Sequence, residues 1–190
     1  MIERLVLVSG NKPKAREVER IIHVPIEIID AEIEEIQSMD PEKIVLHKVN
    51  EAFKMVGRPV IVDDVSFEVE VWNGFPGPLI KWLLEGKNDP SLMLQMLGDE
   101  QNRNATAKLY LGYHDGKESH VFTGEVNGTI TYEARGDNGF GWDRVFVPEG
   151  FDQTFAEMDS NIKDSNIKDS ISHRGKALAK FKEYLDSQKS

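Results

Sequence analysis

The segment Pro59-Val60-Ile61-Val62-Asp63-Asp64 joins a short β-branched run to two adjacent carboxylates. A continuous apolar run that is bounded by Gly57-Arg58-Pro59 and by an acidic pair is typical of a strand inside a parallel sheet. The carboxyl end of this strand would then hold Asp63 and Asp64. Ligands of open α/β sheets bind at that edge, where paired carboxylates bind a hard cation or accept a proton from water. A strand that simply ends in a polar turn is the alternative.

Composition bounds the class of protein. A chain of 190 residues suits one domain, 1–190, or two closely joined lobes. The formal net charge of −10 argues against a general nucleic-acid surface. The absence of cysteine excludes disulfides, thiolate metal sites and cysteine nucleophiles. No apolar segment approaches the roughly 20 residues that cross a bilayer, and the first residues carry no cleavage signature, so we expect a soluble, cytoplasmic protein without a membrane partner.

A strand, a tight loop and a helix open the chain. Arg4 to Val8 predicts a buried strand, and the loop from Ser9 to Lys14 leads into a helix whose apolar face is Ala15, Val18, Ile21 and Ile22. Such a loop directs backbone N–H groups and the positive end of the helix toward its mouth, which favours an anion site. The spacing of a P-loop is absent. The alternative is an ordinary capped helix with solvated lysines.

The next segments supply further charged groups. A strand at 26–29 is followed by an acidic segment, 30–37, from which one glutamate turned toward Asp64 would improve a cation site. Asp40-Pro41 predicts a helix start and Gly57 a helix end. Lys48 lies on the flank of the buried stripe of this helix, where it either extends its stem to solvent or faces the same cleft as Asp64.

The middle of the chain predicts further strands. Residues 65–71 alternate as a half-exposed strand does, and residues 105–113 and 120–131 read as antiparallel strands around Asp115-Gly116. A short helix is expected from Asp89-Pro90 to Gly98. His114 and His120 have no recognisable ligand spacing and receive no role. Together these elements predict an α/β fold with a mixed sheet and flanking helices.

Two later segments combine unusual residues. The glycine-rich stretch 136–143 carries Phe140 and Trp142, which either offer rings on which a nucleobase stacks or tuck into the core. Ser172-His173-Arg174 concentrates positive charge at the start of a helix, which is unfavourable unless an anion lies there.

These pieces together resemble the inosine triphosphate pyrophosphatase family, the Ham1-like enzymes that clear non-standard purine nucleoside triphosphates. The resemblance covers nearly the whole chain. It rests on five motifs in order: Ser9-x-Asn11-x-x-Lys14-x-x-Glu17; Val62-Asp63-Asp64 followed by Asn73-Gly74-Phe75-Pro76-Gly77-Pro78; Phe140-Gly141-Trp142-Asp143; Thr154-Phe155-Ala156-Glu157-Met158; and Ser172-His173-Arg174.

The resemblance implies an elongated mixed sheet, two lobes around a central nucleotide cleft, and a homodimer. It implies Mg²⁺-dependent hydrolysis of ITP, dITP and XTP to the monophosphate and pyrophosphate, which removes deaminated purines from the precursor pool. The site residues that it implies are Asp64 as general base; Glu35, Asp63 and Asp64 around the metal; Ser9, Asn11, Lys14, Lys48 and Lys168 on the phosphates; and Phe140, Gly141, Trp142, Asp143, His173 and Arg174 on the base.

The sequence departs from the family pattern at three places. Val65 and Ser66 follow the acidic pair where the family has Ser or Thr and then Gly or Cys, and Arg144 replaces a proline. Residues 160–164 are repeated at once as 165–169, a loop extension that leaves Lys163 and Lys168 as alternatives for the same role. Lys168 is preferred because it is the lysine found by counting back from Ser172, and Ser172-His173-Arg174 belongs to the site itself. Two rival functions are a Maf-like pyrophosphatase acting on other nucleotides and a nucleotide sensor that has lost hydrolysis.

Overall fold

The computed structural model describes residues 4–10, 12–84, 89–139, 141–158 and 170–188. Its strands form a seven-stranded sheet in the order β2-β1-β3-β5-β6-β7, with β4 paired to β3. The strands are β1 (Leu5–Val8), β2 (Ile26–Ile29), β3 (Val60–Val69), β4 (Pro76–Gly77), β5 (Asn104–His114), β6 (Ser119–Ile130) and β7 (Phe146–Pro148). The helices are α1 (Lys12–Ile22), α2 (Pro41–Val56), α3 (Ile80–Leu84), α4 (Ser91–Leu97) and α6 (His173–Ser187), with 3₁₀ turns η1 (Glu70–Trp72) and η2 (Gly141–Arg144). The predicted mixed α/β fold is confirmed.

The chain divides into two compact units. The first comprises Met1–Asp64, Leu109–Gly124 and Arg174–Ser190, and the second comprises Val65–Lys108 and Glu125–His173. The nucleotide cleft between two lobes and the single domain over 1–190 stay predictions. In the part of the chain that the structure describes, no helix has the length and apolar character that crossing a membrane requires.

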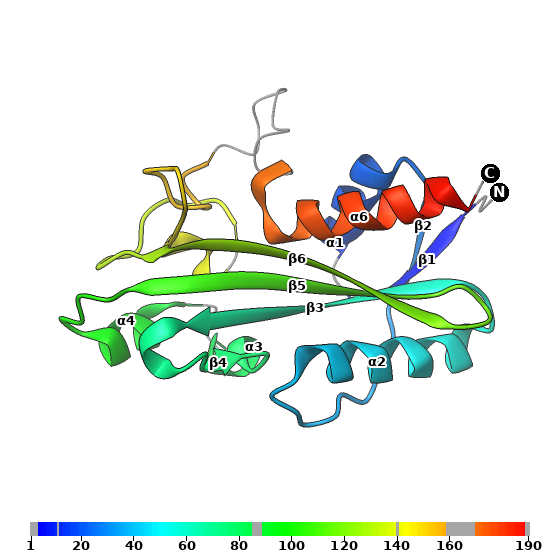
Figure 1. Cartoon of the computed structure of the whole chain (residues 1–190), viewed down its shortest axis with the longest axis horizontal. Helices are drawn as coiled ribbons and strands as arrows, with labels where there is room; N and C mark the ends of the chain where they lie inside the picture. Colours follow the sequence, from blue (N-terminus) through cyan, green and yellow to red (C-terminus); the bar gives the residue numbers. More distant parts are fainter. Residues whose placement is uncertain (1–3, 11, 85–88, 140, 159–169, 189–190) are drawn as a thin grey trace. The chain divides into compact units, whose positions relative to one another are not determined.

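The first unit is built on parallel strands. β1 pairs in parallel with β2, Leu5 opposite Ile26, and with β3, Val6 opposite Val60. Helix α2 covers one face of these strands, and α1 and α6 cover the other (Figure 1). All four residues of β1 are buried as a result. Burial on both faces explains why the strands read as continuous apolar runs instead of alternating with polar residues.

Local chemistry fixes the ends of α2. The Asp40 carboxylate accepts hydrogen bonds from the backbone N–H groups of Glu42, at 3.1 Å, and Lys43, at 3.4 Å. At the other end Gly57 adopts the left-handed conformation, φ 70°, and its N–H donates to the Phe53 carbonyl at 2.8 Å. Both predicted ends of the helix are confirmed.

β5 passes very close to α2. A Cβ atom at Gly112 of β5 would lie 3.0 Å from the Val49 Cβ and 3.2 Å from the Val45 carbonyl oxygen. Val45 and Val49 are fully buried. Glycine at 112 therefore allows the helix to sit directly against the strand.

β3 differs from the prediction. The strand was expected to end at Asp63-Asp64, with a separate strand over 65–71, but it runs without a break from Val60 to Val69. It continues because Phe67 and Val69 are buried and because Phe67 pairs with Gly77 of β4. The parallel register with β1 ends at Ile61, so the two aspartates follow the parallel part of the strand and lie in its middle.

The second unit has an aromatic core. Phe67, Phe146 and Phe155 are completely buried, and Trp142 is 7% exposed. The Phe67 and Phe146 rings meet edge to face at 5.4 Å between centroids, a favoured aromatic geometry. These rings come from segments far apart in the sequence, so their contacts hold the glycine-rich stretch against the sheet.

Candidate functional site

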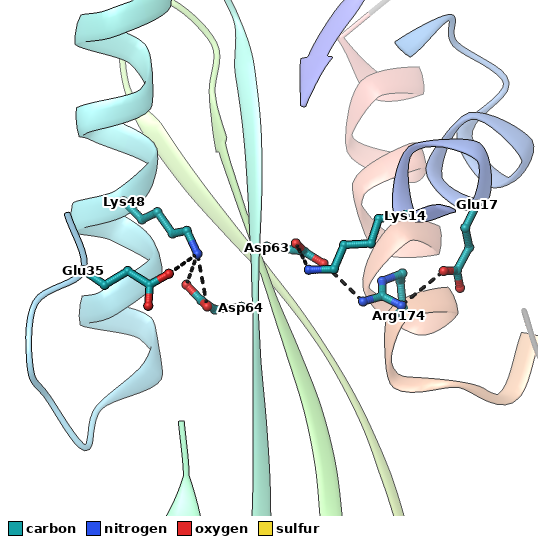
Figure 2. A network of polar contacts seen from close by, with 7 residues as sticks. All are labelled: Lys14, Glu17, Glu35, Lys48, Asp63, Asp64 and Arg174. Carbon is teal, nitrogen blue, oxygen red and sulfur yellow. Dashed lines mark hydrogen bonds and ion pairs between the residues drawn. The ribbon is translucent and has the colours of Figure 1, made fainter. Parts of the chain in front are cut away.

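Asp63 and Asp64 point to opposite faces of β3. Figure 2 shows Asp63 directed toward Lys14 and Arg174, and Asp64 directed toward Lys48 and Glu35. Successive side chains of a strand alternate between faces, so an adjacent pair inside a strand cannot share one side. The acidic pair therefore forms two separate ionic clusters, each with helices on its own face.

The Asp64 cluster contains one lysine between two carboxylates. Lys48 of α2 places its Nζ atom 2.8 Å from Glu35 Oε1, and 3.1 Å and 3.3 Å from the two carboxylate oxygens of Asp64. The Lys48 side chain is only 15% exposed. Lys48 thus faces Glu35 and Asp64 and does not extend its ammonium to solvent, whereas the cleft itself stays a prediction.

The Asp64 cluster carries one more negative than positive charge when all its groups are ionised. Burial raises the pKa of Asp64; Lys48 opposes this, and the negative charges of Glu35 and Asp63 raise the pKa further. Burial lowers the pKa of Lys48, but Asp64 and Glu35 more than compensate, so its pKa is raised. Two carboxylates that converge on one cation offer the oxygen ligands that a hard divalent ion prefers.

The Asp63 cluster lies on the other face. Lys14 Nζ donates to Asp63 Oδ1 at 2.8 Å, and Arg174 donates to Asp63 Oδ2 at 3.3 Å and to Glu17 Oε2 at 3.1 Å. Asp63 is 8% exposed. Burial alone would raise the pKa of Asp63, but Lys14 and Arg174 lower it well below the ordinary value. Asp63 therefore stays ionised and positions two cations.

These contacts separate residues that the sequence placed together. Asp63 was predicted to share the metal shell of Glu35 and Asp64; strand alternation turns it to the opposite face, where it pairs with Lys14 and Arg174. Arg174 was predicted to contact the base, and the structure pairs it with Asp63 and Glu17. The link between Arg174 and Glu17 was missed because the two lie 157 residues apart.

In the second unit, Trp142 packs among other rings. Its centroid lies 4.7 Å from Phe67, 6.2 Å from Phe155 and 5.3 Å from His173. Trp142 and His173 are 7% and 6% exposed. The alternative interpretation of the glycine-rich stretch, a turn that tucks its ring into the core, describes this tryptophan.

Other parts of the same stretch are held by hydrogen bonds. The Ala156 N–H donates to the Asp143 carbonyl at 3.0 Å, and Arg144 Nε donates to the Gly136 carbonyl at 3.1 Å. Arg144, which departs from the family pattern, therefore braces the segment. Gly141 begins η2 and is buried.

Among the remaining predicted residues, Ser9 lies within the described part of the chain. Ser9 follows β1, and its N–H donates to the Ile29 carbonyl at 3.0 Å. Asn11, Phe140, Lys163 and Lys168 lie outside the described residues.

One cluster was missed by the sequence interpretation. At the turn between β5 and β6, ligand atoms of Asp115, Glu118 and His120 lie within 4.8 Å of one another. His120 Nε2 is 3.8 Å from Asp115 Oδ2 and 3.1 Å from the Tyr184 hydroxyl. The acidic residues that flank the turn were the available signal. Turns commonly carry such residues for another reason, because their carboxylates accept hydrogen bonds from the backbone, as Asp115 does from the N–H groups of Lys117 and Glu118.

The chain is similar in structure and in sequence to known proteins. The structure of the Staphylococcus aureus Ham1 protein superimposes with a TM-score of 0.84 at 28% identity, covering 97% of this chain and 99% of that one. A dITP/XTP pyrophosphatase of Methanopyrus kandleri is 36% identical over 185 residues, 95% of each chain. An inosine triphosphate pyrophosphatase of Candida albicans is 40% identical over 149 residues, 77% of this chain and 70% of that one. The Ham1 family model matches residues 5–184, and the chain therefore belongs to the Ham1 family.

Proposed function

We propose that this protein hydrolyses ITP, dITP and XTP to the nucleoside monophosphate and pyrophosphate. Family membership and relatives named as dITP/XTP and inosine triphosphate pyrophosphatases support this activity. The structural observation that carries the proposal is the convergence of Glu35 and Asp64 on one cationic group, Lys48 Nζ. Two carboxylates held around a positive charge suit a site where a metal ion and phosphates meet.

The reaction needs charge neutralisation and an aligned water more than a covalent intermediate. Glu35 and Asp64 would hold Mg²⁺, which when bound neutralises charge on the phosphates. Asp64 would accept the proton of the water that attacks the α-phosphorus, and the bond between that phosphorus and the bridging oxygen of the leaving pyrophosphate would break.

Basic side chains would bind the triphosphate. We assign Lys14, Lys48 and Lys168 to its phosphates, together with the loop that carries Ser9 and Asn11. Asp63 is assigned a new role, because its ion pairs with Lys14 and Arg174 make it a positioning residue for these cations.

Residues 140–143, 173 and 174 would recognise the base. Phe140 stays the predicted stacking ring, since Trp142 leaves little of its surface open. Asp143, His173 and Arg174 are assigned to the base edge. Hypoxanthine and xanthine carry a 6-oxo acceptor where adenine has an amino donor, so a pocket of donors rejects ATP by leaving polar groups unpaired.

We extend the proposal to the setting of the enzyme. Mg²⁺ as the metal and a homodimer are what the family resemblance implies, and a cytoplasmic location is the expectation from the sequence itself. The net charge of −10 supports free nucleotides, not nucleic acid, as the substrate class.

Pyrophosphate release from a nucleotide panel tests the function. ITP, dITP and XTP should be hydrolysed in the presence of Mg²⁺, with far slower release from ATP and GTP and none after chelation. Faster hydrolysis of dTTP or UTP would instead indicate the Maf-like activity. Tight ITP binding without any release would indicate a sensor.

A further inference from the structure

The ammonium group of Lys48 lies where a bound cation would be expected. It contacts Glu35 at 2.8 Å and Asp64 at 3.1 Å, the two carboxylates that we assign to the metal. Figure 2 shows Lys48 reaching between these two residues from α2. Lysine and metal would therefore draw on the same two carboxylates.

Both cations cannot occupy that position together. Mg²⁺ binds carboxylate oxygens at about 2.0–2.1 Å in a strict octahedron, and an oxygen that ligates it has less capacity left to accept a hydrogen bond from the ammonium. The two positive charges would also repel each other in a partly buried site. Metal binding would therefore weaken the contacts of Lys48 with its two partners and favour its departure.

Lys48 has the reach for such a move. It lies between Val45 and Val49, which are fully buried and fix its backbone, whereas its four-carbon stem has rotatable bonds through which the charge can be redirected. A triphosphate bound beside the metal would give the displaced ammonium new anionic partners.

We propose that Lys48 is a built-in competitor of the metal, which holds Glu35 and Asp64 together before catalysis and transfers to the phosphates when metal and nucleotide bind. This inference rests on the proposed function. It implies that Mg²⁺ alone binds weakly, since it must displace Lys48, and that nucleotide strengthens Mg²⁺ binding. By linkage, Mg²⁺ must strengthen nucleotide binding by the same factor.

The decisive variant is Lys48→Met, which keeps the length of the stem and removes the charge. Calorimetric titration with Mg²⁺ in the absence of nucleotide should show tighter binding than in the wild type. An increase of about 5- to 150-fold is the range expected for coupling between sites. A non-hydrolysable ITP analogue should strengthen Mg²⁺ binding to the wild type by a similar factor, and to Lys48→Met much less.

Two controls separate this effect from a general change in charge. Lys54→Met removes a lysine from the same helix, 70% exposed and paired with Glu51, and should leave Mg²⁺ affinity unchanged. Glu35→Gln removes a proposed ligand and should weaken Mg²⁺ binding. Unchanged affinity in Glu35→Gln would remove Glu35 from the metal site and would overturn the proposed competition as well.

The result that overturns the inference is Mg²⁺ affinity in Lys48→Met equal to or weaker than in the wild type. That result is compatible with continued ITP hydrolysis by the wild type, so it leaves the proposed function standing. Removal of the lysine also leaves two carboxylates facing each other, so Mg²⁺ should raise the melting temperature of Lys48→Met more than that of the wild type. A variant that folds only with Mg²⁺ present would likewise support the competition.

Discussion

Asp63 pairs with Lys14 of α1 on one face of β3, whereas its neighbour Asp64 pairs with Lys48 of α2 on the other. Two adjacent aspartates of one strand thus lie in two different ionic environments. Asp63 pairs with two cations and stays ionised, whereas Asp64 shares Lys48 with Glu35 and its pKa is raised. Substitutions of the two residues should therefore have different consequences.

Asp64→Asn should abolish turnover while ITP still binds. The amide keeps the shape of the side chain but neither accepts a proton from water nor ligates a metal as well as a carboxylate. Loss of a general base lowers the rate by about 10²- to 10⁴-fold. Steady-state pyrophosphate release and calorimetric ITP binding measure the two effects, and Glu51→Gln, in an exposed pair, is the control. Full activity in Asp64→Asn would remove Asp64 from the chemistry.

Asp63 should make the protein sensitive to acid. Its pKa in the folded protein lies below the ordinary value of 3.8, so below about pH 4 the unfolded chain takes up a proton that the native state refuses. Stability should therefore fall as the pH decreases through this window, with a slope of at most about 1.4 kcal/mol per pH unit.

Urea unfolding at pH 7 and pH 3 measures this slope. Asp63→Asn cannot titrate there, so its stability should decline less between the two pH values than that of the wild type. Asp152→Asn, at an exposed aspartate, is the matched control and should follow the wild type. Parallel slopes in the wild type and Asp63→Asn would show that the ion pairs of Asp63 contribute nothing to acid stability.

Trp142 should contribute mainly to stability. Trp142→Phe reduces the volume of a ring packed against Phe67 and Phe155, so the free energy of unfolding should fall by about 1 kcal/mol. Trp82, 58% exposed on α3, provides the control, and Trp82→Phe should change the free energy by less than about 0.5 kcal/mol. A raised KM for ITP without loss of stability would instead place the Trp142 ring on the base.

Gly136 should tolerate no side chain. Its φ is +83°, and a Cβ there would lie 2.4 Å from the Ala156 carbonyl carbon. Gly136→Ala therefore combines backbone strain with overpacking, and should cost about 2–5 kcal/mol. Gly150 has a similar φ of +85° but open space around it, so Gly150→Ala should cost only about 1–2 kcal/mol. Equal losses in urea unfolding would show that the crowding at Gly136 is relieved by a small shift.

The sequence predicted elements better than it predicted contacts. The ends of α2 were evident because Asp40 and Gly57 act on backbone groups a few residues away, and such local chemistry is visible in the sequence. The continuation of β3 beyond Asp64 was not, since it depends on burial of Phe67 and on pairing with β4.

The same distinction applies to the site. Lys48 and Glu35 were assigned to the neighbourhood of Asp64, and the structure brings all three together. The direction of Asp63 was not foreseen because the strand was assumed to end at the acidic pair. Once the strand continues, alternation alone turns Asp63 away. The ion pair between Arg174 and Glu17 joins two distant helices, and no local pattern announces it.

The close packing of α2 against Gly112 of β5 also determines where Lys48 lies. Val45 and Val49, the two residues that a methyl group at 112 would strike, flank Lys48 on the helix. A bulkier residue on β5 would push the helix outward and carry the ammonium away from Asp64. Glycine at position 112 therefore helps to set the distance between the Lys48 ammonium and the Asp64 carboxylate.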